Sequence, residues 1–121
     1  MARIKKEYAS RHAPAFILLF LARKSDYGGS LLATMKLEMP HFWGDSAMTY
    51  RTLHTLESEG CIVSQWVIPD MGRPKQMYTL TAKGWERLDE YAKDIQMRQE
   101  NFRFFLDVQQ TVQQNRIPEV E

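Results

Sequence analysis

The residues with the clearest chemistry in this sequence are cations that gather in two short segments. Lys5, Lys6 and Arg11 lie near the start of the chain, and Arg73 and Lys75 flank a proline in a turn-rich segment. Guanidinium and ammonium groups bind phosphate oxygens, and a protein that neutralises several phosphates binds nucleic acid in a salt-dependent way. The pattern therefore predicts phosphate binding at two separate places.

Groups that could catalyse a reaction or hold a metal ion are scattered by comparison. His12, His41 and His54 lie far apart, and His54 with Glu57 supplies too few ligands for a metal site. No paired-carboxylate, His-x-x-x-His or glycine-rich phosphate motif occurs. Cys61 is the only cysteine, which excludes an internal disulfide, and we expect it to be a buried, unreactive thiol. The expectation is a protein that is not an enzyme and has no metal or cofactor.

The overall charge is small, but its distribution along the chain is uneven. The chain of 121 residues has 16 Lys and Arg against 15 Asp and Glu, a formal net charge of +1. Segment 1–12 carries +3, segment 13–80 is neutral and segment 81–121 carries −2. The longest apolar run, 13–22, is too short to cross a membrane and has no cleavage site for a signal peptide. These features predict a soluble cytoplasmic protein with no membrane partner.

Two apolar runs predict two short buried helices near the start of the chain. Residues 14–22 are apolar on all sides and begin with Pro14, which the first turn of a helix tolerates. Residues 30–37 carry leucine and methionine at helical spacing, and Pro40 ends this second helix. Segment 1–12 is then expected to precede the first helix as a basic arm.

A third helix is predicted between a cap at Asp45 or Ser46 and a stop at Gly60. The apolar side chains that would face the core are Met48, Leu53 and Leu56. The outward polar side chains would be Ser46, Thr49, Arg51, Thr52, His54 and Thr55. Such an outer face, short and polar with one arginine, is suited to reading a groove of DNA.

After Gly60 the pattern changes from helix to strand. Residues 61–68 are rich in isoleucine, valine and tryptophan, and residues 76–80 form a return strand after a turn at 70–75. The prediction is a β-hairpin whose tip carries Arg73 and Lys75.

A long helix is predicted from about residue 82 to residue 114, with Thr81 as its cap. It would be roughly 50 Å long, more than the diameter of a domain of this size. Part of its apolar stripe would therefore be exposed to solvent unless another surface packs against it. The simplest way to bury the stripe is to pack it against the same helix of a second copy of the chain. The stripe consists of Trp85, Leu88, Ala92, Ile95, Phe102, Phe105 and Leu106.

The order of these elements predicts a mainly α (α+β) fold. Three helices and a hairpin make a winged helix-turn-helix domain over 13–81, followed by a dimerisation helix over 82–115 and a flexible tail over 116–121. A helix of this type fits the major groove, and a hairpin can rest on the adjacent backbone.

The stretch 15–91 resembles the PadR-type transcriptional regulators in three local patterns. Asp-Tyr-Gly-Gly-Ser-Leu-Leu at 26–32 is similar to the start of the second helix of that family. Met-Thr-Tyr-Arg-Thr-Leu-His-Thr-Leu-Glu-Ser-Glu-Gly at 48–60 resembles its recognition helix. The segment 72–84, which begins Gly-Arg-Pro-Lys and contains Leu-Thr-Ala-Lys-Gly, resembles its wing and exit. The length and the single C-terminal helix are similar to the short subgroup of the family.

This resemblance implies a homodimeric repressor that reads an inverted-repeat operator in double-stranded DNA. The recognition helices would enter successive major grooves, the wing would touch the flanking backbone, and the terminal helix would hold the dimer. The residues expected to contact DNA are Lys5, Lys6, Tyr8, Arg11, Ser46, Thr49, Tyr50, Arg51, His54, Arg73 and Lys75.

Two further interpretations remain open at the level of sequence. Because Asp45, Glu57 and Glu59 flank a third helix with one arginine, the domain could instead bind a protein partner, with DNA binding secondary or absent. The aromatic and methionine side chains would also suit a small aromatic inducer, although packing in the core or at the dimer interface is the simpler explanation for them. These side chains are Met35, Met39, Phe42, Trp43, Trp66, Trp85 and Met97.

Overall fold

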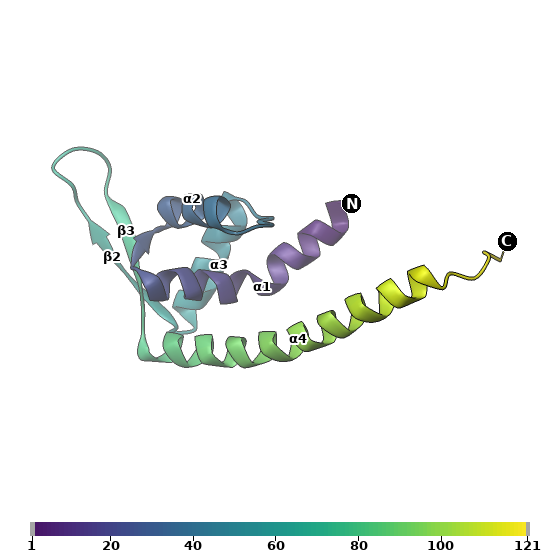
Figure 1. The fold of residues 1–121 in the computed structure, drawn as a ribbon. Helices are drawn as coiled ribbons and strands as arrows, with labels where there is room; N and C mark the ends of the chain where they lie inside the picture. The colour runs from purple at the N-terminus through teal and green to yellow at the C-terminus, as the bar shows by residue number, and fades with distance from the viewer. Residues whose placement is uncertain (1, 121) are drawn as a thin grey trace. The chain divides into compact units, whose positions relative to one another are not determined.

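A computed structural model describes the backbone of residues 2–120 and the side chains of residues 11–120. The chain divides into two units, one ending at Asp89 and the other beginning at Glu90. Figure 1 shows the elements. In chain order they are α1 (Ala2–Arg23), β1 (Asp26–Tyr27), α2 (Gly28–Glu38), α3 (Ser46–Ser58), β2 (Ile62–Val67), β3 (Lys75–Leu80) and α4 (Ala82–Gln114).

The first helix is longer than the sequence pattern predicts. We expected it to begin at Pro14 after a basic arm, but α1 begins at Ala2 and contains Pro14 in its interior. A proline inside a helix removes one backbone hydrogen bond and bends the helix without always ending it. Figure 1 shows such a bend in α1. The backbone of the expected arm therefore continues α1.

The core of the first unit lies where α1, α2 and α3 meet. Its fully buried side chains are Ile17, Leu18, Leu31, Met35, Thr49, Leu53, Leu56, Cys61 and Ile62. The apolar faces expected for the second and third helices are therefore confirmed, and Cys61 is buried and free of any disulfide, as predicted. Burial of these side chains is the main force that holds the three helices together.

Both ends of α3 follow the signals in the sequence. The Asp45 carboxylate accepts a hydrogen bond from the Met48 backbone N–H at 2.8 Å, which makes Asp45 the N-cap. At the other end, Gly60 has a φ of +81°, in the left-handed region that favours glycine. Both ends of α3, which carries several of the residues expected to contact DNA, are therefore defined by local structure.

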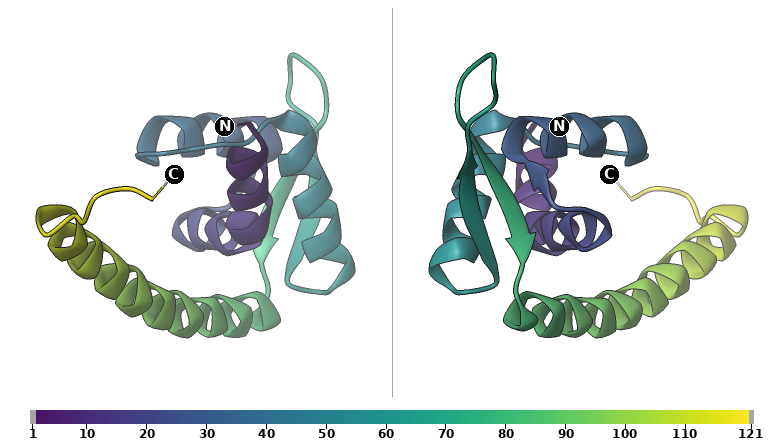
Figure 2. Two further views of the ribbon diagram at one scale, coloured as in Figure 1. Left: turned by 90° about the vertical axis from the view of Figure 1, so that its right-hand side faces the viewer. Right: turned by 90° about the vertical axis from the view of Figure 1, so that its left-hand side faces the viewer.

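The sheet has one strand that the sequence pattern did not predict. Asp26 and Tyr27 lie between the two helices expected at 14–22 and 30–37, and they pair antiparallel with Tyr78 and Met77 of β3. The strand order is β1-β3-β2, and β2 and β3 form the expected hairpin, with Val67 opposite Lys75 at its outer end. Figure 2 shows from two sides that the hairpin loop extends beyond the helices of the first unit.

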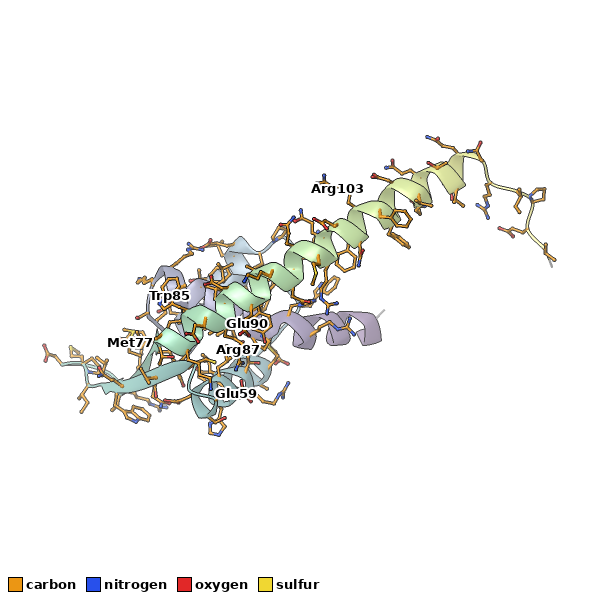
Figure 3. The ribbon with its side chains drawn as sticks, turned by 90° about the horizontal axis from the view of Figure 1, so that it is seen from below. Glu59, Met77, Trp85, Arg87, Glu90 and Arg103 are labelled. Atoms are coloured by element: carbon orange, nitrogen blue, oxygen red, sulfur yellow. The ribbon has the colours of Figure 1, made fainter. Side chains whose placement is uncertain are left out.

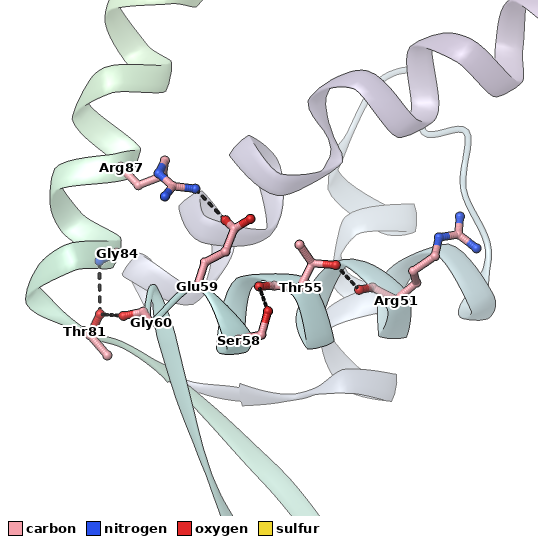
Figure 4. Close-up of polar contacts among 8 residues, drawn as sticks. All are labelled: Arg51, Thr55, Ser58, Glu59, Gly60, Thr81, Gly84 and Arg87. Carbon is pink, nitrogen blue, oxygen red and sulfur yellow. Dashed lines mark hydrogen bonds and ion pairs between the residues drawn. The ribbon is translucent and has the colours of Figure 1, made fainter.

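The first turn of α4 is joined to the end of α3 by polar contacts. The Thr81 hydroxyl donates to the Gly60 carbonyl at 2.6 Å and accepts from the Gly84 N–H at 3.1 Å, so Thr81 caps α4 as predicted. Arg87 then forms an ion pair with Glu59 at 2.8 Å. Figure 4 shows both contacts, and Figure 3 shows Trp85 and Arg87 on different sides of α4. The start of α4 is thus fixed on the first unit.

In the second unit, α4 continues to Gln114, the end that the sequence predicts. Asp94 and Arg98 pair at 2.7 Å one turn apart. The large apolar side chains of this unit are exposed, among them Phe102 at 57%, Phe105 at 64% and Leu106 at 58%. None of the helices in the described part of the chain is long and apolar enough to cross a membrane.

Candidate nucleic-acid interface

The outer face of α3 consists of two neighbouring rows of side chains. Ser46, Tyr50 and His54 follow one another at four-residue spacing, and so do Ala47, Arg51 and Thr55. All six are exposed, and residues 46–55 include no aspartate or glutamate. Figure 4 shows the Arg51 side chain extending from α3 away from the Glu59–Arg87 pair. The face offers hydroxyl, imidazole, phenol and guanidinium groups together with the methyl groups of Ala47 and Thr55.

Thr49 does not belong to this face. The expectation that it points outward is wrong, because its side chain is 0% exposed and its hydroxyl donates to the Asp45 carbonyl at 2.9 Å. Thr52 is half-buried and donates in the same way to the Met48 carbonyl at 2.8 Å. Conversely, Ala47, which is not among the side chains expected to face outward, is exposed.

Tyr50 lies against the first residue of α2. A Cβ atom at Gly28 would come within 2.5 Å of Tyr50 Cε1, so only glycine allows the ring to pack at its present position. The ring remains 46% exposed. Gly28 therefore positions an aromatic hydroxyl at the junction of α2 and α3.

A cleft of about 320 Å³ separates this junction from the wing. Its walls include Ser30 of α2, Tyr50 of α3, and Trp66 and Lys75 of the hairpin. The Lys75 ammonium lies over the Tyr27 ring, 5.4 Å from its centroid, which gives the cation a defined position. The sequence pattern did not place Ser30 or Trp66 among the DNA contacts. Trp66 is 65% exposed on β2, and no signal in the sequence distinguishes it from a strand tryptophan that packs in the core.

The wing tip presents the cations that the sequence predicted there. Arg73 and Lys75 are both exposed, and Gly72 beside them has a φ of +100°, which turns the chain at the tip. Arg11 is also exposed, but it lies on α1. The side chains of Lys5, Lys6 and Tyr8 lie outside those that the structure describes.

The acidic groups that flank α3 are engaged within the domain. The Asp45 side chain caps the helix, Glu57 accepts a hydrogen bond from the Ser64 hydroxyl at 2.6 Å, and Glu59 pairs with Arg87. Burial, together with the nearby Glu57 charge, raises the pKa of Tyr78. The Tyr78 phenol, which lines the cleft, is therefore uncharged at neutral pH. The acidic groups that favoured a protein partner thus have structural roles.

Among the residues that the structure describes, no three His, Cys, Asp or Glu side chains gather as a possible metal site. The side chains that do converge are the cations, hydroxyls and aromatic rings of α3, the start of α2 and the wing.

Comparisons with known proteins found several solved structures with a similar fold. A PadR family transcription regulator from Eggerthella lenta DSM 2243 has a TM-score of 0.75 at 20% identity, covering 87% of this chain and 90% of that chain. A PadR family regulator from Clostridium difficile R20291 has a TM-score of 0.69 at 20% identity, with coverages of 78% and 98%. Bacillus subtilis PadR in complex with operator DNA has a TM-score of 0.63 at 29% identity, covering 68% of this chain and 47% of that chain. No curated protein matches the chain.

The fold and the first two likenesses define a winged-helix domain followed by a long helix, as the sequence predicted. Residues 17–90 match the sequence model of the Transcriptional regulator PadR-like family, which is more than half of the chain. The chain belongs to the PadR-like family of transcriptional regulators.

Proposed function

We propose that this chain is a sequence-specific DNA-binding protein that represses transcription as a homodimer at an inverted-repeat operator. The observation that carries the proposal is the exposed face of α3, where Tyr50, Arg51 and His54 stand together without an acidic neighbour between residues 46 and 55. The likeness to Bacillus subtilis PadR, a protein whose structure includes operator DNA, supports the same conclusion.

The base-reading element in this proposal is α3. The major groove of B-DNA is wide enough to admit a helix, and an arginine there can donate two hydrogen bonds to one guanine. Arg51 and His54 are the groups best placed for base contacts, while the exposed Ala47 methyl offers an apolar contact to a thymine. Thr49 has no part in this reading because it is buried.

Phosphate contacts come from the rim of the cleft and from the wing. Lys75 and Tyr50 line the cleft, which the flanking DNA backbone could enter, and Arg73 is exposed two residues before Lys75 at the wing tip. The α2 helix begins at this cleft, and the positive end of its dipole favours a phosphate nearby. Lys5, Lys6, Tyr8 and Arg11 would extend the phosphate contacts along α1.

Dimerisation is assigned to α4. The predicted stripe contains exposed aromatic and aliphatic side chains, a surface that a second copy would cover. The stripe residues are Trp85, Leu88, Ala92, Ile95, Phe102, Phe105 and Leu106. A twofold dimer presents two copies of α3 in opposite directions, and its natural target is an inverted repeat. Such a protein would act in the cytoplasm and would need no catalytic group.

The proposal is tested by measuring the affinity of the full chain for duplexes from the region upstream of its own gene. Arg51→Ala should weaken binding at least about fivefold and relax the choice of base at one position in each half-site, since a bidentate contact is worth about 1–3 kcal/mol. Arg103→Ala, which removes an exposed arginine of α4 (Figure 3), is the matched control and should leave affinity unchanged. The absence of binding to any duplex at low salt would refute the proposal and favour a module that binds protein partners.

A further inference from the structure

The tip of the wing exposes two large apolar side chains beside its cations. Ile68 is 79% exposed and Met71 is 89% exposed, in a loop that extends beyond the helices of the first unit (Figure 2). Met71, Arg73 and Lys75 line one hollow of about 160 Å³, so the methionine and both cations lie around the same point of the wing. Neither Ile68 nor Met71 belongs to the buried core, and their exposure has no role in holding the domain together.

The backbone of this tip is restricted. Pro69 and Pro74 each fix one backbone φ, and Gly72 turns the chain with a φ of +100°. A Cβ atom at Gly72 would lie 3.9 Å from Pro69 Cγ, so the proline ring lies beside the turn. A loop restricted in this way loses little conformational entropy when it binds. Met71, between Pro69 and Gly72, is therefore presented by a preorganised turn.

From this arrangement we infer that the wing enters the minor groove of the bound duplex, where Met71 acts as an apolar wedge that unstacks one base step and bends the DNA. The inference rests on the proposed function and gives the wing an activity beyond phosphate contact. Methionine and isoleucine are among the side chains that proteins insert between base steps from the minor groove, and such insertion kinks a duplex by about 20–90°. Insertion between base planes also removes the Met71 side chain from water.

The charges of the tip fit the minor groove. This groove is about 6 Å wide, too narrow for a helix, and its negative potential attracts arginine and lysine where it narrows further. Arg73 and Lys75 are both exposed, and Asp70 is the single acidic residue between positions 68 and 75. The two cations outnumber this carboxylate, so the tip keeps a positive charge beside its apolar side chains.

The small size of the apolar patch favours DNA over a protein partner. A stable protein interface buries about 800 Å² on each partner, far more than two side chains at a loop tip can cover. A wedge, in contrast, needs a single side chain to separate two base pairs. If Ile68 and Met71 instead pack on a protein, the bound duplex should be straight, which is one outcome of the experiment.

The bend is measured by energy transfer between dyes at the two ends of a duplex from the region upstream of the gene, bound by the full chain. The unaltered protein should bend it by at least about 20°. Met71→Ala should at least halve the bend, whereas Met71→Leu keeps a wedge side chain and should retain most of it. Leu37→Ala, which shortens another exposed apolar side chain of the first unit, is the matched control and should leave the bend unchanged. A straight duplex with the unaltered protein, or an equal bend with Met71→Ala, would overturn the inference.

The salt dependence separates a wedge from a general loss of the wing contact. An apolar contact releases no counterions, so the slope of log K against log salt should change by less than about 0.5 in Met71→Ala. A slope that falls together with the bend would show that Met71 only holds the wing on the backbone, and would overturn the wedge.

The position of the wedge is found with the base analogue 2-aminopurine, whose fluorescence rises when it is unstacked. Placed at each step in turn, it should brighten at one step in each half-site with the unaltered protein and stay dim with Met71→Ala. A duplex with no bright step would overturn the inference. A protein that binds no duplex at low salt would refute the proposed function and the wedge with it, whereas binding to a straight duplex would refute the wedge alone.

Discussion

Removal of both wing cations should change the salt dependence of DNA binding by a calculable amount. Arg73 and Lys75 are exposed at the tip of the hairpin, and Lys75 is held over the Tyr27 ring. If each cation neutralises one phosphate, Arg73→Ala with Lys75→Ala removes two phosphate contacts from each wing and four from a dimer. Neither side chain is part of the buried core, so the domain should remain folded.

The size of the effect follows from counterion release. Each phosphate contact contributes about −0.9 to the slope of log K against log salt, so four contacts contribute about −3.6. Over a fourfold rise in salt, the unaltered protein should lose about 150-fold more affinity than the double variant. Because phosphate contacts carry no sequence information, the preference for operator over random duplex should stay within about threefold.

Fluorescence anisotropy with a labelled duplex between about 50 and 200 mM salt measures both slopes. Lys93→Ala with Arg103→Ala, which removes two exposed cations from α4, is the matched control and should leave the slope unchanged. Equal slopes for the wing variant and the unaltered protein would refute the placement of the wing on the backbone. A lost preference for the operator with an unchanged slope would show that the wing reads bases.

Three further variants test the packing behind the interface. Gly28→Ala should displace the exposed Tyr50 ring, since the new Cβ would meet Cε1 at 2.5 Å, and should lower DNA affinity with little change in unfolding free energy. Gly84→Ala should reduce the unfolding free energy in urea by about 1–3 kcal/mol, because its Cβ would lie 2.1 Å from the backbone oxygen of Cys61. Tyr78→Phe should remove a loss of stability at alkaline pH. Because the pKa of the Tyr78 phenol is higher in the folded than in the unfolded protein, this group stabilises the fold fully below the unfolded pKa of about 10. That stabilisation is lost as the pH rises through the folded pKa.

Each of these variants has a control or a contrary outcome in the same measurement. Gly29→Ala would place its Cβ 3.9 Å from the Tyr50 hydroxyl, an ordinary contact, so it should not alter DNA affinity. Lys83→Ala changes an exposed neighbour of Gly84 and should leave the urea midpoint unchanged. Identical alkaline unfolding curves for Tyr78→Phe and the unaltered protein would contradict a role for burial at Tyr78.

The elements whose ends depend on local signals were predictable from the sequence. Asp45 and Gly60 delimit α3 and Thr81 caps α4, because caps and stops act through local backbone geometry and hydrogen bonds within a few residues. The β-branched and aromatic residues of 61–68, followed by the turn at 70–75, likewise identified the hairpin, and the apolar positions 48, 53 and 56 identified the buried face of α3. The family resemblance rested on the same local patterns, and the match over residues 17–90 confirms it.

Only the tertiary structure decided which polar side chains reach the surface and which elements meet. Thr49 is buried and Ala47 is exposed, because burial depends on how α1 and α2 pack on α3 and not on side-chain polarity alone. Likewise, β1 exists because β3 offers Asp26 and Tyr27 a free edge. The contact of Gly28 with Tyr50 joins residues 22 positions apart, and no local pattern specifies it. The sequence alone therefore determined the class of protein, while packing between distant segments decided the composition of the site.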